Sequence, residues 1–330
     1  MPLLYWLWIF ASCFLAVSLF GFALLVIDRL QQNRRNTAMS AARTAILGLL
    51  AQGHLSNERL KRQVAIAERH GSLGSVILEA LSLVAGAPRR VFLNRLESAG
   101  AAHRLRRHAR RGRRHSRLVA IQALAAFTDD RSTSCLVRLW RDFDDAVRLG
   151  ALGASLGGPS APGFETVVAA ASATPPHLRG RAQRLIRAAA LIHHRESAHA
   201  LMRRELPTWL RLQLAESLHC SHDPAVIPAL LAAAHDPEAE LRAAAIGALA
   251  ASAAPEGMSA ILDAINDTIW LVRVRAVSAA GKLRLEAARA FLMLRLEDAN
   301  WWVRLRAREA LGLLDESGQA RVPIARGLRP

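Results

Sequence analysis

An arginine returns along this chain of 330 residues at an almost constant interval, and that interval constrains the fold more than any other feature of the sequence. Its positions are separated by 31 or 32 residues throughout: Arg117, Arg148, Arg179, Arg211, Arg242, Arg273 and Arg304. Arginines placed by chance would not keep so regular a spacing. The sequence therefore predicts structural repeats of about 31 residues each.

Neighbouring positions follow the same interval and indicate what each repeat contains. Five of the arginines have an acid six residues earlier, at Asp142, Glu205, Asp236, Asp267 and Asp298. Within one repeat the apolar residues fall at i, i+4, i+7 and i+8, the stripe of a helix, as in Leu241, Ala245, Ala248 and Leu249. Between these stripes lies a second apolar segment that also recurs every 31 residues, as at Leu230, Ile261 and Leu292. Each repeat is predicted to be a helix pair, and pairs this thin must stack to bury their stripes.

The last repeats share a pattern of an Asp, five residues, an Arg and an Ala-rich helix that ends near Leu-Gly, as in Asp298, Arg304 and Gly312. This pattern resembles HEAT repeats, in particular the short bacterial type also called lyase-like HEAT, and the resemblance covers residues 116–315. It weakens upstream, where Arg111 and Ala173 stand in place of the acid. The resemblance implies an all-α fold, an α-solenoid of HEAT-like helical hairpins. It also implies a structural hydrogen-bonded ladder between adjacent repeats, in these pairs: Asp236 with Arg242, Asp267 with Arg273, and Asp298 with Arg304.

The chain opens with a run of apolar residues that holds no charge from residue 3 to residue 27. At a rise of 1.5 Å per residue, a helix of this length can cross a hydrocarbon core of about 30 Å. We therefore expect one transmembrane helix over residues 3–27, with an aromatic cluster at its interfacial start: Tyr5, Trp6 and Trp8. A cleaved signal peptide is the alternative, but no basic residue precedes the run.

Basic residues follow this run at Arg29, Arg34 and Arg35. The positive-inside rule then places the N-terminus outside and the repeats in the cytoplasm, in a single-pass protein. The alternative is a periplasmic array, which would require these arginines to be translocated. An excess of Arg over Lys suggests a bacterial source, and hence the inner membrane. Three cysteines without a paired pattern favour a reducing compartment.

The net charge of +17 is unevenly distributed. Residues 1–117 hold 19 Arg or Lys against 5 acids, a net +14, whereas residues 118–330 hold 25 against 22, a net +3. Within the basic segment, residues 89–115, the stretch 103–115 carries arginines on every side of any helix that it forms. It is therefore predicted not to be an ordinary buried repeat helix, and to be solvated or bound to anions. We expect it to contact anionic lipid head groups, through these residues: Arg104, Arg106, Arg107, Arg110, Arg111, Arg113 and Arg114. An acidic protein, a nucleic acid or solvent alone are the alternatives.

These features divide the chain into successive segments. After the transmembrane helix we expect a polar connector at 28–36, an irregular helical cap at 37–88, the basic segment, the repeat array at 116–315 and a loose tail at 316–330. About 280 residues outside the membrane are ample for a continuous core.

Catalytic motifs are not apparent in the sequence, which holds no glycine-rich phosphate loop, nucleophile elbow or zincin pattern. We therefore expect neither an enzyme nor a cofactor nor a small-molecule substrate. The cluster His219, Cys220 and His222 has zinc-ligand chemistry. Its position, however, is typical of a helix end, with Asp223 capping the next helix, and this is the interpretation we prefer.

Tryptophans recur at equivalent positions, Trp270 with Trp301 and Trp209 with Trp302. Two adjacent tryptophans cannot both face the core of one helix, so we expect at least one of Trp301 and Trp302 to be exposed. Both are candidate partner contacts, together with Arg275 and Arg306, although the sequence favours packing between repeats for these tryptophans. The sequence as a whole favours a scaffold for an unidentified protein partner, such as a membrane enzyme or transport assembly. Nucleic-acid binding is less well supported because residues 118–330 are nearly neutral, and a bilin-lyase-like enzyme is a third alternative.

Overall fold

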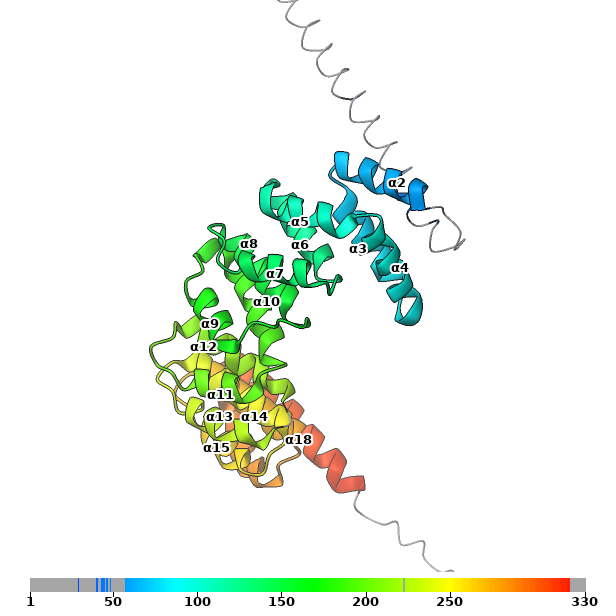
Figure 1. Cartoon of the computed structure of the whole chain (residues 1–330). Coiled ribbons are helices and arrows are strands. Elements are labelled where there is room, and N and C mark those ends of the chain that lie inside the picture. The colour runs from blue at the N-terminus through cyan, green and yellow to red at the C-terminus, as the bar shows by residue number, and fades with distance from the viewer. Residues whose placement is uncertain are drawn as a thin grey trace, which may run out of the picture. The chain divides into compact units, whose positions relative to one another are not determined.

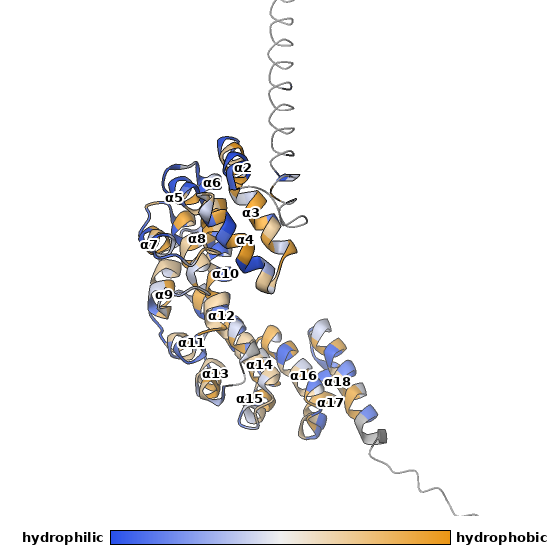
Figure 2. Ribbon diagram, turned by 45° about the vertical axis from the view of Figure 1, so that its right-hand side comes forward, coloured by the Kyte–Doolittle hydropathy of each residue, from blue (hydrophilic) through white to orange (hydrophobic). Residues whose placement is uncertain are grey.

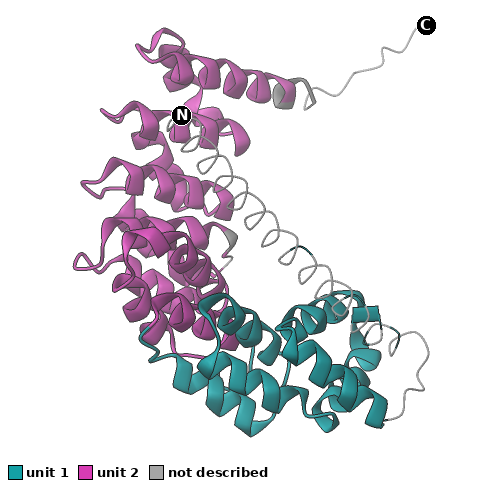
Figure 3. Cartoon of the chain, turned by 90° about the horizontal axis from the view of Figure 1, so that it is seen from above, with its two compact units in different colours: residues 1–143, 157–160 teal, residues 144–156, 161–330 magenta. Residues whose placement is uncertain are grey.

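The computed structural model describes residues 57–221 and 223–320, together with Arg29, Ser40, Arg43, Thr44, Ile46 and Gly48. The described residues form α-helices joined by turns and short 3₁₀ segments, with no β-strand among them. The chain divides into two compact units, residues 1–143 with 157–160 and residues 144–156 with 161–330 (Figure 3). This confirms the predicted all-α class.

The second unit is a stack of helical hairpins in which each hairpin packs on the next (Figure 1). Its second helices, α10, α12, α14, α16 and α18, contact one another in succession, as do the first helices α11, α13 and α15. The helices are α8 (Asp145–Ser155), α9 (Phe164–Ser172), α10 (Arg179–Ala190), α11 (His194–Leu201), α12 (Thr208–Ser217), α13 (Ile227–Ala233), α14 (Ala239–Ser252), α15 (Gly257–Ala264), α16 (Trp270–Lys282), α17 (Arg289–Leu294) and α18 (Trp301–Ala320). The 3₁₀ segments are η1 (Pro176–Leu178), η2 (Leu218–Cys220), η3 (Pro224–Val226), η4 (Glu286–Ala288) and η5 (Arg295–Glu297).

The core of this unit consists of the apolar positions that repeat in the sequence. Leu230, Ile261 and Leu292, one from each successive first helix, are fully buried. The stripe on the second helices is also buried, as at Leu241, Ala245, Val272, Ala276, Val303 and Ala307. Small residues in this stripe bring the helices close together. The predicted helix pairs and their inward faces are thus confirmed.

Gly281 marks the closest approach between two second helices. A Cβ atom added there would lie 2.7 Å from Cβ and 2.8 Å from Cα of Ala310, which is too close for two carbon atoms. Only glycine fits at this point without a shift of α16 against α18.

The first unit contains six described helices that also pack as neighbours. They are α2 (Asn57–Arg69), α3 (Leu73–Leu83), α4 (Gly86–Ser98), α5 (Ala101–Arg111), α6 (Arg114–Leu124) and α7 (Asp130–Leu139). Helix α5 packs against α3, α4, α6 and α7. Gly100 has a φ of 79°, a left-handed conformation that lets the chain turn from α4 into α5.

Helix α5 corrects the prediction that the basic segment cannot form a buried repeat helix. Ala101, Leu105 and Ala109, at i, i+4 and i+8, are buried with Ala102 and form a narrow apolar stripe between the arginines. Figure 2 shows that the rest of the helix is strongly hydrophilic. A stripe of small residues is sufficient here because neighbouring helices approach closely, so the arginines surround a packed helix.

The segments predicted at the two ends of the chain are only partly described by the structure. Helix α18 continues to Ala320, so the tail predicted to begin at residue 316 starts as helix. The predicted transmembrane segment at 3–27 and the connector at 28–36 lie outside the described residues, apart from Arg29. Among the residues that are described, no helix has the length and apolarity needed to span a membrane.

Candidate functional site

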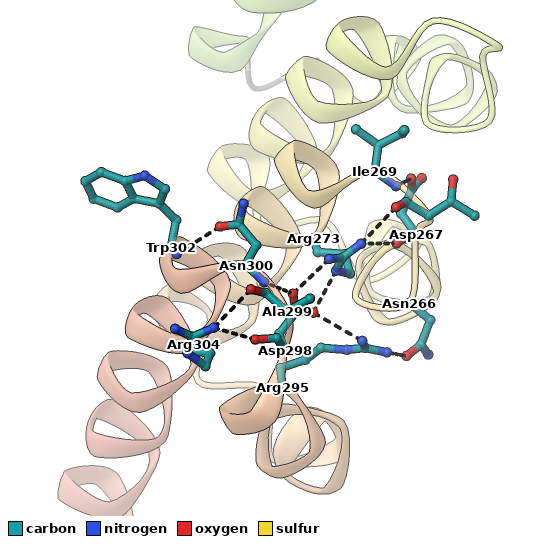
Figure 4. A network of polar contacts seen from close by, with 11 residues as sticks. Asn266, Asp267, Ile269, Arg273, Arg295, Asp298, Ala299, Asn300, Trp302 and Arg304 are labelled. Atoms are coloured by element: carbon teal, nitrogen blue, oxygen red, sulfur yellow. Dashed lines mark hydrogen bonds and ion pairs between the residues drawn. The ribbon is translucent and has the colours of Figure 1, made fainter.

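An Asp–Arg ladder links consecutive repeats of the second unit (Figure 4). Arg273 donates from Nε and Nη2 to the two carboxylate oxygens of Asp298, both at 2.8 Å. Arg242 does the same to Asp267 at 2.8 and 2.9 Å, and Arg211 donates to Asp236 at 2.6 Å. Each arginine therefore pairs with the aspartate 25 residues later, in the next repeat.

This register corrects the pairs expected from the sequence. Asp236 with Arg242, Asp267 with Arg273 and Asp298 with Arg304 were expected as partners, but each arginine contacts that aspartate only at the main chain. Arg242 donates to the carbonyl oxygen of Asp236, Arg273 to that of Asp267 and Arg304 to that of Asp298. One guanidinium thus holds the loop of its own repeat and the carboxylate of the next, which explains why both residue types recur.

Each ladder aspartate also organises the start of the following helix. Asp298 Oδ1 accepts a hydrogen bond of 2.9 Å from the Asn300 N–H, and Asp267 Oδ1 accepts one of 2.8 Å from Ile269. Burial alone would raise the pKa of Asp298, but the hydrogen bonds from Arg273 and Asn300 outweigh it and hold that pKa below its ordinary value. The same balance lowers the pKa values of Asp267 and Asp236. The ladder carboxylates are therefore structural anions.

The ladder is interrupted in the repeats that lack the recurring acidic residue. Residues 25 positions after Arg148 and Arg179 are Ala173 and Arg204. Arg148 pairs instead with Asp145 in its own helix, and the Arg179 guanidinium lies over the Trp209 ring at 5.8 Å from the centroid. In the first unit, Arg117 and Asp142 keep the 25-residue pairing.

The two adjacent tryptophans at the start of α18 are both solvent-exposed. Trp301 is 53% and Trp302 50% exposed, and their rings meet edge to face at a centroid distance of 4.6 Å. Ile269 and Trp270, at the start of α16, are also exposed. These four residues, which we call the aromatic rim, lie at the starts of two consecutive second helices, and Trp270 and Trp301 occupy equivalent positions. All four are exposed, so the packing between repeats that the sequence favoured does not bury these tryptophans.

The arginines predicted beside these tryptophans are exposed as well. Arg306 lies one helical turn after Trp302 and donates to Glu309 at 2.6 Å, whereas Arg275 has no ion-pair partner within the described part of the chain. The ring of neither Trp301 nor Trp302 stacks on these guanidinium groups. The rim and the arginines are thus separate parts of one exposed surface.

The arginines of the basic segment divide into two groups. Arg104 and Arg107 both pair with Glu68 of α2, whose side chain is only 5% exposed, and His108 lies 3.7 Å from the same carboxylate. Burial tends to raise the pKa of Glu68, but the hydrogen bond and charge of Arg104 and the charge of Arg107 lower it overall. Arg104 and Arg107 are therefore occupied in holding α2 against α5.

Four of the five other arginines predicted to bind a ligand face solvent. Arg110, Arg111 and Arg113 are exposed and pair with no carboxylate within 57–221 and 223–320, and Arg114 is also exposed. Arg106 is half-buried and donates to Asp129 at 2.7 Å and to Ser132 at 2.9 Å. The sequence therefore overestimated how many of the seven arginines are available to a ligand.

The histidine and cysteine cluster is only partly described. His219 Nδ1 contacts the main-chain oxygen of Glu216, as expected at a helix end. Asp223 accepts from the Ala225 N–H at 2.9 Å and so caps the next helical segment, η3, as the sequence predicted. His222 and the Cys220 side chain lie outside the described residues, and the described ones include no group of three metal-ligand side chains.

Comparison with known proteins bears on the repeats alone. Residues 227–312 match the family model described as HEAT repeats. Over these residues the chain is similar to HEAT repeats. The match covers α13 to α18, where the ladder is continuous, and no curated protein sequence matches the chain.

Solved structures match much of the chain, but with low sequence identity and low TM-scores. Human deoxyhypusine hydroxylase is 15% identical, with 85% of this chain and 98% of that one covered and a TM-score of 0.34. An engineered protein is 15% identical over 86% of this chain and 95% of its own, with a TM-score of 0.40. Kap121p is 13% identical over 88% of this chain and 39% of its own, with a TM-score of 0.42.

Proposed function

We propose that this protein is a membrane-anchored cytoplasmic scaffold that binds another protein through the aromatic rim. HEAT repeats form helical scaffolds for protein interactions, and residues 227–312 are similar to such repeats. The observation that carries the proposal is the exposure of Trp301 and Trp302 at the start of α18. Tryptophan is among the residues that contribute most to protein–protein binding energy.

The rim has the properties of an interaction surface. Ile269, Trp270, Trp301 and Trp302 leave large apolar side chains in water, which costs free energy that a partner could recover by covering them. The ladder residues Asp267 and Asp298 lie immediately before each pair and fix the helix starts by hydrogen bonds. A rigid platform loses little entropy on binding, so the rim is suited to recognition.

The sequence supports the proposed location of the scaffold. The uncharged run at 3–27 and the arginines after it support an inner-membrane anchor with the repeats in the cytoplasm. The partner we propose is a membrane enzyme or transport assembly, because an anchor confines the platform to the surface where such proteins lie. The near neutrality of residues 118–330 makes nucleic acid a poor ligand for the repeats.

A site-specific photo-crosslinking experiment in the native membrane tests this function. A photoreactive phenylalanine replaces Trp301 in the full-length protein, and the same amino acid replaces the exposed Arg187 of α10 as a matched control. We expect one discrete crosslinked protein from the first position only, and its loss when Trp302→Ala is added. Equal crosslinking from both positions, or none from either, would show that the rim does not bind a partner.

The anchor is tested separately. A reporter fused after Pro330 should be active in the cytoplasm, and the mature chain should retain residues 3–27. Reporter activity in the periplasm, or a mature chain that starts after residue 27, would contradict the proposed location.

A further inference from the structure

A groove with a basic lining runs between α5 and α7. Its main part has a volume of about 370 Å³ and is lined by His103, Arg106 and Arg110 from α5 and by Asp130, Arg131 and Ser134 from α7. A second hollow of about 240 Å³ shares the three α5 residues and extends to Arg107 and Arg111. We call the two together the α5–α7 groove.

The charges in this groove do not cancel. Arg106 is neutralised by Asp129, and Arg107 shares the buried Glu68 with Arg104. Arg110, Arg111 and Arg131 form no ion pair with any carboxylate in the described part of the chain, and Asp130 is the only acid that lines the groove. The groove therefore carries a positive charge in excess.

The geometry points to a phosphate ester as the ligand, and we propose that the α5–α7 groove binds the phosphate of an anionic lipid head group. Arginine side chains present a planar fork of N–H groups that matches phosphate oxygens. Arg110 and Arg131 approach the groove from different helices and can bind a phosphate from two sides. The Ser134 hydroxyl and the His103 ring can each add a hydrogen bond.

One basic side chain of the groove is fixed in advance. Arg106 is held by hydrogen bonds of 2.7 Å to Asp129 and 2.9 Å to Ser132, so its position does not depend on a ligand. Asp129 in turn accepts from the Ser132 N–H as the N-cap of α7. This part of the lining is therefore in place before binding, which lowers the entropy cost of capturing an anion.

The lining favours a compact anion over a macromolecule. No apolar residue lines the groove, although a peptide partner would need an apolar anchor in a pocket. No aromatic side chain other than the His103 ring is present to stack on a base, as single-stranded nucleic acid binding requires. A phosphate head group needs neither.

The choice of a lipid over a soluble phosphate ester rests on the proposed membrane location. Residues 1–117 carry a net charge of +14, and the groove lies in this part of the chain and in α7. A protein anchored at 3–27 exposes these residues to the anionic cytoplasmic leaflet, which attracts cationic side chains.

The test uses the full-length protein purified in an uncharged detergent. Binding of short-chain phosphatidylglycerol, phosphatidylcholine and soluble glycerol phosphate is measured by calorimetry in the same micelles. The groove variant is Arg110→Gln/Arg131→Gln, and the matched control is Arg138→Gln/Arg187→Gln, which removes the same charge from exposed positions outside the groove. Arg110→Lys/Arg131→Lys keeps the charge and removes the fork.

We expect phosphatidylglycerol to bind more tightly than phosphatidylcholine or glycerol phosphate. The groove variant should weaken this binding about tenfold or more, the lysine variant less, and the control less than about twofold. Because the four substituted arginines are exposed, we expect every variant to fold like the wild type. An unchanged circular dichroism spectrum would check this.

Three outcomes would overturn the proposal. If the groove and control variants weakened phosphatidylglycerol binding equally, the lipid would be attracted by the net charge of the protein and not by a specific site. Glycerol phosphate that binds as tightly as the lipid would make the ligand a soluble ester, and displacement of the lipid by polyglutamate would indicate an acidic protein. Binding in detergent does not depend on membrane topology, so it tests the groove alone. The reporter at Pro330 tests the proposed anchor, and the two proposals can therefore fail independently.

Discussion

Helix α5 and the ladder repeats use the same two side-chain types in opposite ways. In α12, α14 and α16 the ladder arginine meets one carboxylate of the next repeat, so positive and negative charges alternate along the stack. In α5 two arginines and a histidine surround the single carboxylate of Glu68, whereas Arg110 and Arg111 pair with no carboxylate in the described part of the chain. Paired charges hold repeats together, whereas the surplus charges are free to bind a ligand.

Paired and unpaired charges also serve different purposes in the two regions. The ladder is saturated by residues of the chain itself, and its buried ion pairs fix the register of the repeats. The α5–α7 groove leaves basic groups exposed, at a cost in mutual repulsion that an anion would relieve. Four predictions test this contrast, in order of decreasing expected effect.

Acid should affect the ladder most, because it acts on every rung at once. The pKa values of Asp236, Asp267 and Asp298 lie below those of the unfolded chain, about 3.9 for aspartate. Their stabilisation is therefore fully present above about pH 4 and is lost as pH falls through the lower folded values. Hydrogen exchange at decreasing pH, corrected for intrinsic rates, should show α14, α16 and α18 losing protection together below about pH 4. Protection that persists there would show that the carboxylates do not hold the repeats.

Asp298→Ala should be the most damaging single change. The Asp298 side chain is 2% exposed, and its removal leaves Arg273 without its carboxylate partner and the Asn300 N–H without a side-chain acceptor. We expect a loss of about 3 kcal/mol in the free energy of unfolding, measured by urea denaturation. A loss below about 1 kcal/mol would mean that the pair contributes little beyond its own desolvation.

Glu68→Gln should weaken the first unit without affecting the ladder. The change leaves Arg104 and Arg107 with a neutral partner, and we expect a loss of about 2 kcal/mol. Hydrogen exchange should accelerate in α2 and α5 and stay unchanged in α16. Faster exchange in both units would show that they do not respond independently.

Glu309→Gln should have the smallest effect. The pair of Arg306 with Glu309 spans one turn of α18 and both side chains are largely exposed. Solvent and salt screen such pairs, so the free energy of unfolding should change by less than about 0.5 kcal/mol. It is the matched control for Asp298→Ala, and a comparable loss from both would remove the distinction between buried and exposed pairs.

The repeat itself could be predicted from sequence because its signals are local and periodic. The 31-residue interval and the i, i+4 stripes identified helix pairs and their buried faces. The partner of each arginine could not be predicted in this way. One acid lies six residues before the arginine and another lies 25 residues after it, and both spacings recur along the chain, so spacing alone does not choose between them. Only the stacking of repeats shows that Arg273 reaches forward to Asp298.

The basic segment was misread for a related reason. Its arginines outnumber the stripe of Ala101, Leu105 and Ala109, and the carboxylate that neutralises two of them, Glu68, is more than 30 residues away. Sequence spacing cannot reveal that contact. Exposure of both Trp301 and Trp302 went further than the prediction, which required only one of them to face solvent.

Arg304 has a consequence for how such a protein can be lengthened. It donates to the carbonyl oxygens of Asp298 and Ala299 but meets no carboxylate among the described residues. Its guanidinium could therefore bind the aspartate of one additional repeat. A designed 31-residue unit that replaces the chain after Leu313, with an aspartate 25 positions beyond Arg304, should dock by the same geometry. The last arginine of the 31-residue column makes the molecule extensible, one hairpin at a time.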